Sequence, residues 1–122
     1  MIEKRNYHRL SKSSIVRFRF SKSHLGMSSR SENICEEGIR LATLQRLLPG
    51  MIVDLNFQLH EFTPPILATA KVMWQNDRDN IYYPFAVGLK FTKIDSEDRA
   101  RIRNHIKTAN RETSFSIHKT SH

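Results

Sequence analysis

Two arginines near the start of the chain have the type and spacing to bind an anion. The stretch EKRNYHRLSK, residues 3–12, places Arg5 and Arg9 four positions apart. A guanidinium group is a rigid fork of donors that grips a phosphate or the O6/N7 edge of guanine, and its flat face stacks on a base. In an extended chain the two side chains lie roughly 13 Å apart. The pair can clasp a ligand with two anionic or guanine ends, and a solvated pair on a surface arm is the simpler alternative.

A second candidate is the stretch NICEEGI, residues 33–39. Asn33 can bend the chain as an Asx turn and also offers a side-chain amide. Gly38 can take a positive φ, or it can let a base approach its bare backbone. Cys35 adds only a weak S–H donor. The same residues also describe a tight connection between two strands without a ligand, so this stretch alone leaves both interpretations open.

The positive charge of the chain is concentrated around the arginine pair. The 122 residues include 20 Lys and Arg and 12 Asp and Glu, for a formal net charge of +8. Residues 1–30 hold eight of the basic residues and one acidic residue, which is +7 of that total. An anionic partner should therefore meet this end of the chain, unless the charge serves solubility alone.

Stretches with a two-residue apolar rhythm predict the strands that position these candidates. In IVRFRF, residues 15–20, Val16, Phe18 and Phe20 share one side of a strand. Residues 26–35 are less regular and predict a weak strand that enters a loop. The inward rows expected from the remaining strands are Ile39 and Leu41; Met51, Val53, Leu55, Phe57 and Leu59; Ile66, Ala68, Ala70, Val72 and Trp74; and Tyr83, Phe85, Val87, Leu89 and Phe91.

From Ser96 the apolar period becomes that of a helix. Ile102, Ile106 and Ala109 fall four and three positions apart, and acidic residues precede basic ones, which suits the helix dipole. The polar segment after Ala109 has no such period and predicts a frayed tail. Short strands with one apolar face close most economically into a barrel, because closure removes unpaired edges. The predicted fold is all-β with one helix: a six-stranded antiparallel β-barrel followed by a C-terminal α-helix.

The two candidate motifs, taken with the order of the elements, resemble the PilZ domain family. RNYHR at 5–9 is similar to the family's Arg-x-x-x-Arg motif, and NICEEG at 33–38 resembles its Asp/Asn-x-Ser-x-x-Gly motif. KVMWQ at 71–75 resembles a strand that carries a common tryptophan, and FAVGLKFTKIDSEDRARIRNHI at 85–106 is similar to the closing strand and helix. The resemblance covers residues 3 to about 107.

This resemblance implies a function and a set of site residues. PilZ domains are bacterial receptors for cyclic di-GMP, which is held between the basic N-terminal arm and the barrel as a monomer or a stacked pair. The resemblance assigns phosphates and guanine edges to Arg5 and Arg9, guanine polar groups to Asn33, the motif's serine position to Cys35, and backbone contact to Gly38. Weaker candidates are Lys4, Arg40 and Trp74. For Arg40 a solvated surface role, and for Trp74 core packing, stay open.

Cys35 is the one departure from the second motif. A thiol fits the volume of serine but donates and accepts hydrogen bonds poorly. The loss of one good hydrogen bond costs ~1 kcal/mol, which is about five- to tenfold in affinity. We therefore expect binding that is weakened rather than abolished.

The predicted organisation is one domain at 13–109, between a basic arm at 1–12 and a flexible tail at 110–122. The chain has no apolar run of membrane-spanning length and no signal-peptide core, and its single cysteine cannot form an intramolecular disulfide. A bacterial cytoplasmic protein is expected. Its signal would have to pass to a protein partner, which the sequence does not name.

Three other functions fit the sequence less well. An enzyme is not expected, because the histidines show no triad or metal spacing, and no metal or cofactor is predicted. A small-barrel nucleic-acid-binding module would need exposed aromatic residues, whereas Phe18 and Phe20 are expected to be buried. An adaptor of the same fold that has lost the ligand is disfavoured by the arginine pair and mildly favoured by Cys35.

Overall fold

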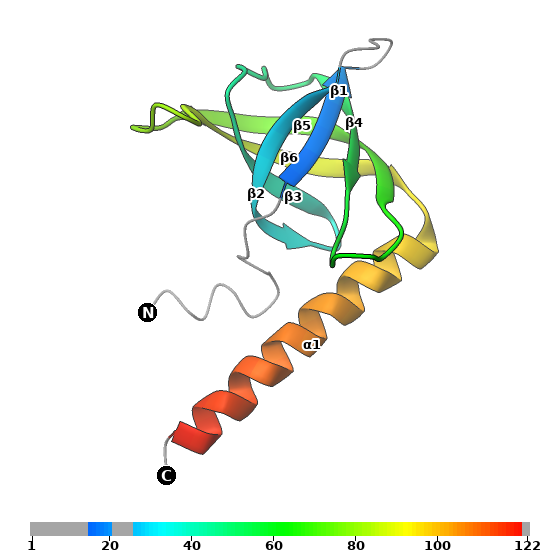
Figure 1. The fold of residues 1–122 in the computed structure, drawn as a ribbon. Helices are drawn as coiled ribbons and strands as arrows, with labels where there is room; N and C mark the ends of the chain where they lie inside the picture. The colour runs from blue at the N-terminus through cyan, green and yellow to red at the C-terminus, as the bar shows by residue number, and fades with distance from the viewer. Residues whose placement is uncertain (1–14, 21–25, 121–122) are drawn as a thin grey trace.

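The structure is a computed structural model that describes residues 15–20 and 26–120, with side chains described as far as Ala109. Within these residues the chain forms six strands and one helix (Figure 1). The elements are β1 Ile15–Phe20, β2 Met27–Cys35, β3 Gly38–Thr43, β4 Ile52–Phe57, β5 Ile66–Asp77, β6 Phe85–Ile94 and α1 Ser96–Thr120.

The strands close into a barrel in the order β1-β2-β3-β6-β5-β4, and every neighbouring pair is antiparallel. The predicted six-stranded barrel with a C-terminal helix is confirmed. Closure between β1 and β4 joins the first strand to the fourth, with Val16 paired to Phe57 and Phe20 to Val53. The barrel therefore has no unpaired edge strand among the described residues.

Alternation of apolar and polar residues fills the interior, as predicted except at Trp74, described below, and at Tyr83, which precedes β6 and is only partly buried. Val16 and Phe18 of β1 are buried, and the rings of Phe57 and Phe91 stack with centroids 6.3 Å apart. Residues near the barrel ends are only partly buried, among them Phe20, Met51, Leu59 and Phe85. The remaining buried side chains of the core cluster are Ile34, Ile39, Leu41, Leu47, Val53, Leu55, Ile66, Ala68, Ala70, Val72, Val87, Leu89, Ile102 and Ile106.

Strand β2 is longer and more regular than the sequence indicated. It extends over nine residues and pairs with both β1 and β3. Its apolar rhythm is hidden because two of its inward positions are serines. Ser29 is fully buried and donates its hydroxyl to the carbonyl oxygen of Val16 at 2.9 Å. Asn33 consequently lies within the strand and does not start an Asx turn, and the β2–β3 turn consists of Glu36 and Glu37.

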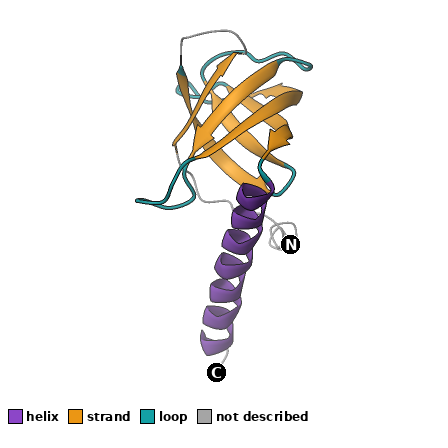
Figure 2. Ribbon diagram, turned by 90° about the vertical axis from the view of Figure 1, so that its right-hand side faces the viewer, coloured by secondary structure: helices purple, strands orange, loops and turns teal. Residues whose placement is uncertain are grey.

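Helix α1 begins at Ser96 as predicted and closes one end of the barrel. Its buried residues Ile102 and Ile106 pack into the core cluster. From there the helix projects away from the barrel (Figure 2). No helix among the described residues is both long and apolar enough to cross a membrane.

The helix continues to Thr120, so the frayed tail expected after Ala109 is wrong for the backbone of residues 110–120. Neither glycine nor proline occurs after Ser96. Once the first turns are docked, each further residue adds a hydrogen bond without a new nucleation cost, and an apolar period is not needed. The division into arm, domain and tail otherwise stays a prediction.

Candidate functional site

A row of residues crosses four neighbouring strands on the outer wall of the barrel. Asn33 of β2 pairs with Arg40 of β3, Arg40 pairs with Gly88 of β6, and Gly88 pairs with Trp74 of β5. Residues directly opposite each other in antiparallel strands share a face. We call the surface around Asn33, Arg40, Gly88 and Trp74 the outer face. Three residues that the sequence singled out from separate segments thus lie side by side.

Trp74 is on this face because of a β-bulge. Simple alternation from Val72 predicted that the indole would lie in the core, and that prediction is wrong. The β5–β6 ladder shifts register between Val72 and Trp74, so that Met73 is an extra residue and the following side chains change face. Trp74 is 37% exposed.

Gly88 makes room for the tryptophan ring. A Cβ atom at this position would lie 2.1 Å from the indole Nε1, so only glycine lets the ring lie across β6. Across the glycine, the guanidinium carbon of Arg40 lies 5.4 Å from the centroid of the Trp74 ring, a cation–π contact. A flat aromatic surface and a cation are therefore presented together.

A second row lies beside the first. Cys35 pairs with Gly38, Gly38 with Lys90, and Lys90 with Lys71. Cys35 is half-buried, while Lys90 and Lys71 are exposed. The sequence does not reveal the two lysines as site residues, because their place next to the NICEEG motif depends on strand register. Together with Arg40 they give this wall of the barrel a cationic character.

The positive φ that the sequence allowed at Gly38 is not found, and the glycine is required there for strand packing. Among the described glycines only Gly50 has a positive φ, so Gly38 does not provide a left-handed turn. A Cβ atom on Gly38 would instead lie 2.1 Å from the carbonyl oxygen of Leu89 in β6. The glycine allows close approach of two strands, and the β2–β3 turn is held by a bond from the Phe91 N–H to the Glu37 carbonyl at 2.8 Å.

Two arginines converge on Glu32, next to Asn33. Arg40 Nε lies 3.0 Å from Glu32 Oε1. Arg78 Nη1 bonds to Glu32 Oε2, and Arg78 is held in the β5–β6 hairpin by donating its backbone N–H to the Pro84 carbonyl at 2.7 Å. Sequence reasoning missed Glu32 and Arg78, since 46 positions separate them and nothing local indicates the contact.

An ion pair connects the β2–β3 turn, Glu36 and Glu37, to helix α1. We call this turn the motif turn. Arg103 Nη2 of α1 lies 2.9 Å from Glu36 Oε1 in the β2–β3 turn. The hydrogen bond from Arg103 holds the pKa of the Glu36 carboxyl below its usual value, and the same bond raises the pKa of Arg103. Both groups are solvent-exposed, so the pair orients the turn more than it stabilises the fold.

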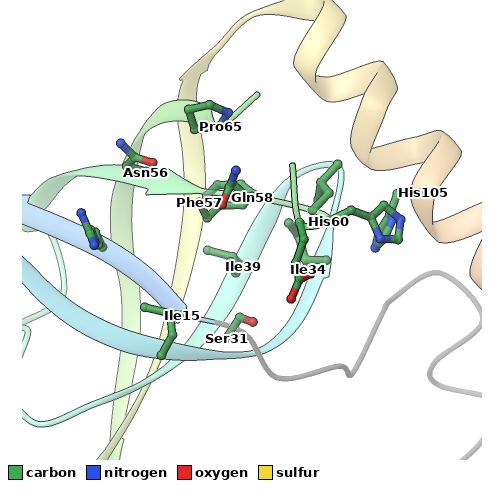
Figure 3. A pocket seen from close by; sticks show the side chains of 13 residues that line it. Ile15, Ser31, Ile34, Ile39, Asn56, Phe57, Gln58, His60, Pro65 and His105 are labelled. Atoms are coloured by element: carbon green, nitrogen blue, oxygen red, sulfur yellow. The ribbon is translucent and has the colours of Figure 1, made fainter. Parts of the chain in front are cut away.

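A cavity of about 920 Å³ opens at the end of the barrel, between the β4–β5 loop and α1 (Figure 3). Apolar side chains such as Ile34, Ile39 and Phe57 line much of it. At its edge the rings of His60 and His105 meet edge to face, with centroids 4.4 Å apart. The sequence did not predict this cavity. Polar side chains, among them Arg17, Asn56 and Gln58, complete its lining.

Arg5, Arg9 and Lys4 lie outside the described residues, so the structure does not place them. Ile15, the first residue described, pairs with Arg30 of β2, and β2 continues from Arg30 toward Asn33. Six residues of extended chain span roughly 20 Å, and three strand residues span roughly 10 Å. A chain of that length therefore allows Arg9 to reach the outer face. The described residues contain no group of three or more His, Cys, Asp and Glu that could hold a metal ion.

These features define a small closed barrel whose outer wall combines arginine, amide and indole groups. The chain belongs to the PilZ domain family, whose model matches residues 3–108. The match includes both the RNYHR stretch and the NICEEG motif. None of the curated proteins compared with this chain matches it.

Solved structures share the fold at low sequence identity. The inhibitor of motility MotI/DgrA of Bacillus subtilis has a TM-score of 0.72 at 18% identity, with 85% of this chain and 50% of that chain covered. The Borreliella burgdorferi protein PlzA, solved in complex with c-di-GMP, has a TM-score of 0.56 at 13% identity, with 87% and 38% covered. The PilZ domain of CeSA from a cellulose-synthesizing bacterium has a TM-score of 0.55 at 10% identity, with 88% and 98% covered. This chain thus spans half or less of the first two proteins.

Proposed function

We propose that this chain is a receptor for cyclic di-GMP that binds the dinucleotide between its N-terminal arm and the outer face. The observation that carries the proposal is the row of Asn33, Arg40 and Trp74, which strand register brings together beside the NICEEG motif. Family membership and the similarity to PlzA, which was solved with this ligand, support it.

Each residue has a role that follows from its chemistry. Arg5 and Arg9 bind phosphates and guanine edges bidentately, and Lys4 adds positive charge. The Asn33 amide meets polar edges of guanine, and the indole of Trp74 offers a surface on which a base stacks.

The remaining contacts lie close to the motif turn. Arg40 contributes a phosphate contact, and the exposed Lys90 beside Gly38 contributes further positive charge. Gly38 offers the ligand a backbone contact, as the family motif implies, and Cys35 makes the weak hydrogen bond of a thiol where the motif has serine.

Binding on this face has a route to a protein partner. The motif turn is bonded to α1 through Glu36 and Arg103, so ligand contact at the turn acts on the helix that projects from the barrel. We propose an adaptor that works in the cytoplasm by changing the surface it shows to another protein, and that catalyses no reaction. The Bacillus neighbour is itself described as an inhibitor of motility.

Calorimetric titration with cyclic di-GMP tests the proposal. Arg5→Ala and Arg9→Ala should each weaken binding about tenfold or more, since a hydrogen bond to a charged group contributes about 1.5–3 kcal/mol. Arg19→Ala is the matched control, because Arg19 lies on β1 and pairs with Asp54 at 3.5 Å on the other side of the barrel. Absence of binding by the unaltered protein at millimolar ligand and low salt would refute the proposal.

A nucleic-acid-binding module is the second candidate, and the exposure of Trp74 on a cationic face favours it. Base stacking on one aromatic side chain contributes about 1–3 kcal/mol without sequence preference. A short single-stranded oligonucleotide should then bind more tightly than cyclic di-GMP and with a steep dependence on salt. Phe18, by contrast, is buried as predicted and offers no second stacking surface.

A further inference from the structure

Glu32 occupies a β-bulge at the edge of the outer face. The β2–β3 register shifts between Ser31 and Asn33, and Glu32 has no partner residue on β3. A bulge bends the strand and aims the extra side chain in a direction that regular pairing would not allow. Here the side chain is aimed at two arginines of other elements, one residue before Asn33.

One carboxylate holds two cations in this cluster. Glu32 uses one oxygen for Arg40 on β3 and the other for Arg78 of the β5–β6 hairpin. The side chains are partly exposed, at 27% for Glu32, 43% for Arg40 and 30% for Arg78. A pocket of about 340 Å³, lined in part by Arg30, Glu32 and Arg78, opens beside the pair. An anion in this pocket can reach Arg78, and its direct competitor there is the Glu32 carboxylate. Arg40, on the other oxygen of Glu32, is open to an anion from the outer face.

We propose that Glu32 is an affinity-determining residue that competes with a ligand phosphate for Arg40 and Arg78, so that Arg78 also belongs to the binding face. This inference rests on the proposed function. A bound phosphate takes over the guanidinium groups that Glu32 holds in the free protein, and the carboxylate is left beside an anion.

The Glu32 carboxylate could affect ligand affinity in two opposite ways. It could raise the affinity by positioning Arg40 for the ligand, or lower it by keeping Arg40 from binding the ligand. Arg40 is also held by the Trp74 ring at 5.4 Å, so its guanidinium keeps its place when Glu32 is removed. A half-exposed ion pair contributes little to positioning, whereas a carboxylate near a phosphate is repelled at short range. Competition therefore outweighs positioning, and loss of the negative charge should tighten binding about three- to tenfold.

The test is calorimetric titration of cyclic di-GMP into the full chain and its Glu32→Gln variant. Glu32→Gln should bind about three- to tenfold more tightly. The control variant Asp54→Asn removes a carboxylate that is paired with Arg19 on the β1–β4 side, and it should leave the affinity unchanged. Circular dichroism spectra establish that each variant is folded.

A second set of variants distinguishes direct competition for the two arginines from long-range repulsion between Glu32 and the ligand. In a chain with both Arg40→Gln and Arg78→Gln, the added Glu32→Gln change should no longer tighten binding. A gain retained without the two arginines would overturn the proposed competition.

The outcomes distinguish this inference from the proposed function. If the unaltered protein binds and Glu32→Gln binds equally or more weakly, the inference is overturned and the function stands. If neither protein binds at millimolar ligand, the proposed function fails and the inference fails with it. Detectable binding by Glu32→Gln alone would support competition by Glu32, but it would still refute the proposal that the unaltered protein is a receptor.

Discussion

Replacement of Gly88 by alanine should displace the tryptophan ring from β6. The added Cβ atom would lie within 2.1–2.7 Å of Nε1, Cε2 and Cζ2 of the indole, all of them side-chain atoms. The half-exposed ring can swing outward, so the backbone ladder between β5 and β6 need not move. The substitution therefore removes the contact between Trp74 and Arg40 while it preserves the barrel.

The expected loss of stability follows from the surface that the ring uncovers. A tryptophan side chain buries roughly 150–250 Å², and release of a ring that is 37% exposed uncovers about 100 Å² more. At ~25 cal/mol per Å² this costs about 2.5 kcal/mol, and the cation–π contact adds roughly 0.5–1 kcal/mol. Alanine returns about 0.5–1 kcal/mol, because glycine is unfavourable inside a strand. The free energy of unfolding should therefore fall by about 2–3 kcal/mol.

Urea unfolding followed by intrinsic fluorescence measures both effects, since Trp74 is the only tryptophan of the sequence. The emission of the folded Gly88→Ala protein should shift to the red as the ring enters water. Gly26→Ala is the matched control, because a Cβ atom there meets nothing within 4 Å. If the two variants show the same emission maximum and the same stability, the argument that Gly88 seats the indole is refuted.

Three further predictions concern the motif and its turn. Cys35→Ser should tighten the binding of cyclic di-GMP about five- to tenfold in calorimetry, and an unchanged affinity would place this side chain away from the ligand. Gly38→Ala should lower the free energy of unfolding by roughly 3 kcal/mol in urea titrations, because the atom that it meets at 2.1 Å is the backbone oxygen of Leu89; stability equal to that of the parent would contradict this. In Arg103→Gln, the pKa of Glu36 should rise toward 4.5 in an NMR titration of the carboxyl group. Because folding lowers the pKa of Glu36, the ionised carboxylate stabilises the fold above its unfolded-state pKa. That stabilisation is lost as the pH falls through the folded-state pKa. Arg103→Gln should lose less stability than the parent over this acidic range.

Residue alternation predicted the barrel because most strands present one apolar side. It failed at Trp74, since the rule counts residues and a bulge inserts one that has no partner. It also underestimated the length and regularity of β2. There, buried Ser29 takes the place of an apolar residue and donates its hydroxyl to a backbone carbonyl. The two errors differ in origin: a register shift places Trp74 on the outer face, whereas in β2 a hydroxyl bonded to a backbone carbonyl lets serine occupy an inward position.

The candidate site was predicted only in part. The family motif pointed to Asn33, Cys35 and Gly38, and the structure brings Asn33 together with Arg40 and Trp74. Glu32 and Arg78 could not be found from the sequence, because a hairpin and a bulge bring them together. For Arg5 and Arg9 the assignment stays a prediction.

The pairing of Glu36 with Arg103 has a mechanical consequence. The contact lies near the start of a helix that extends to Thr120, so the remaining turns act as a lever roughly 25 Å long. A tilt of about 5° at this pivot would carry the far end through ~2 Å, by simple geometry along that length. Small adjustments of a two-residue turn are thereby amplified at the tip of α1, far from the wall of the barrel.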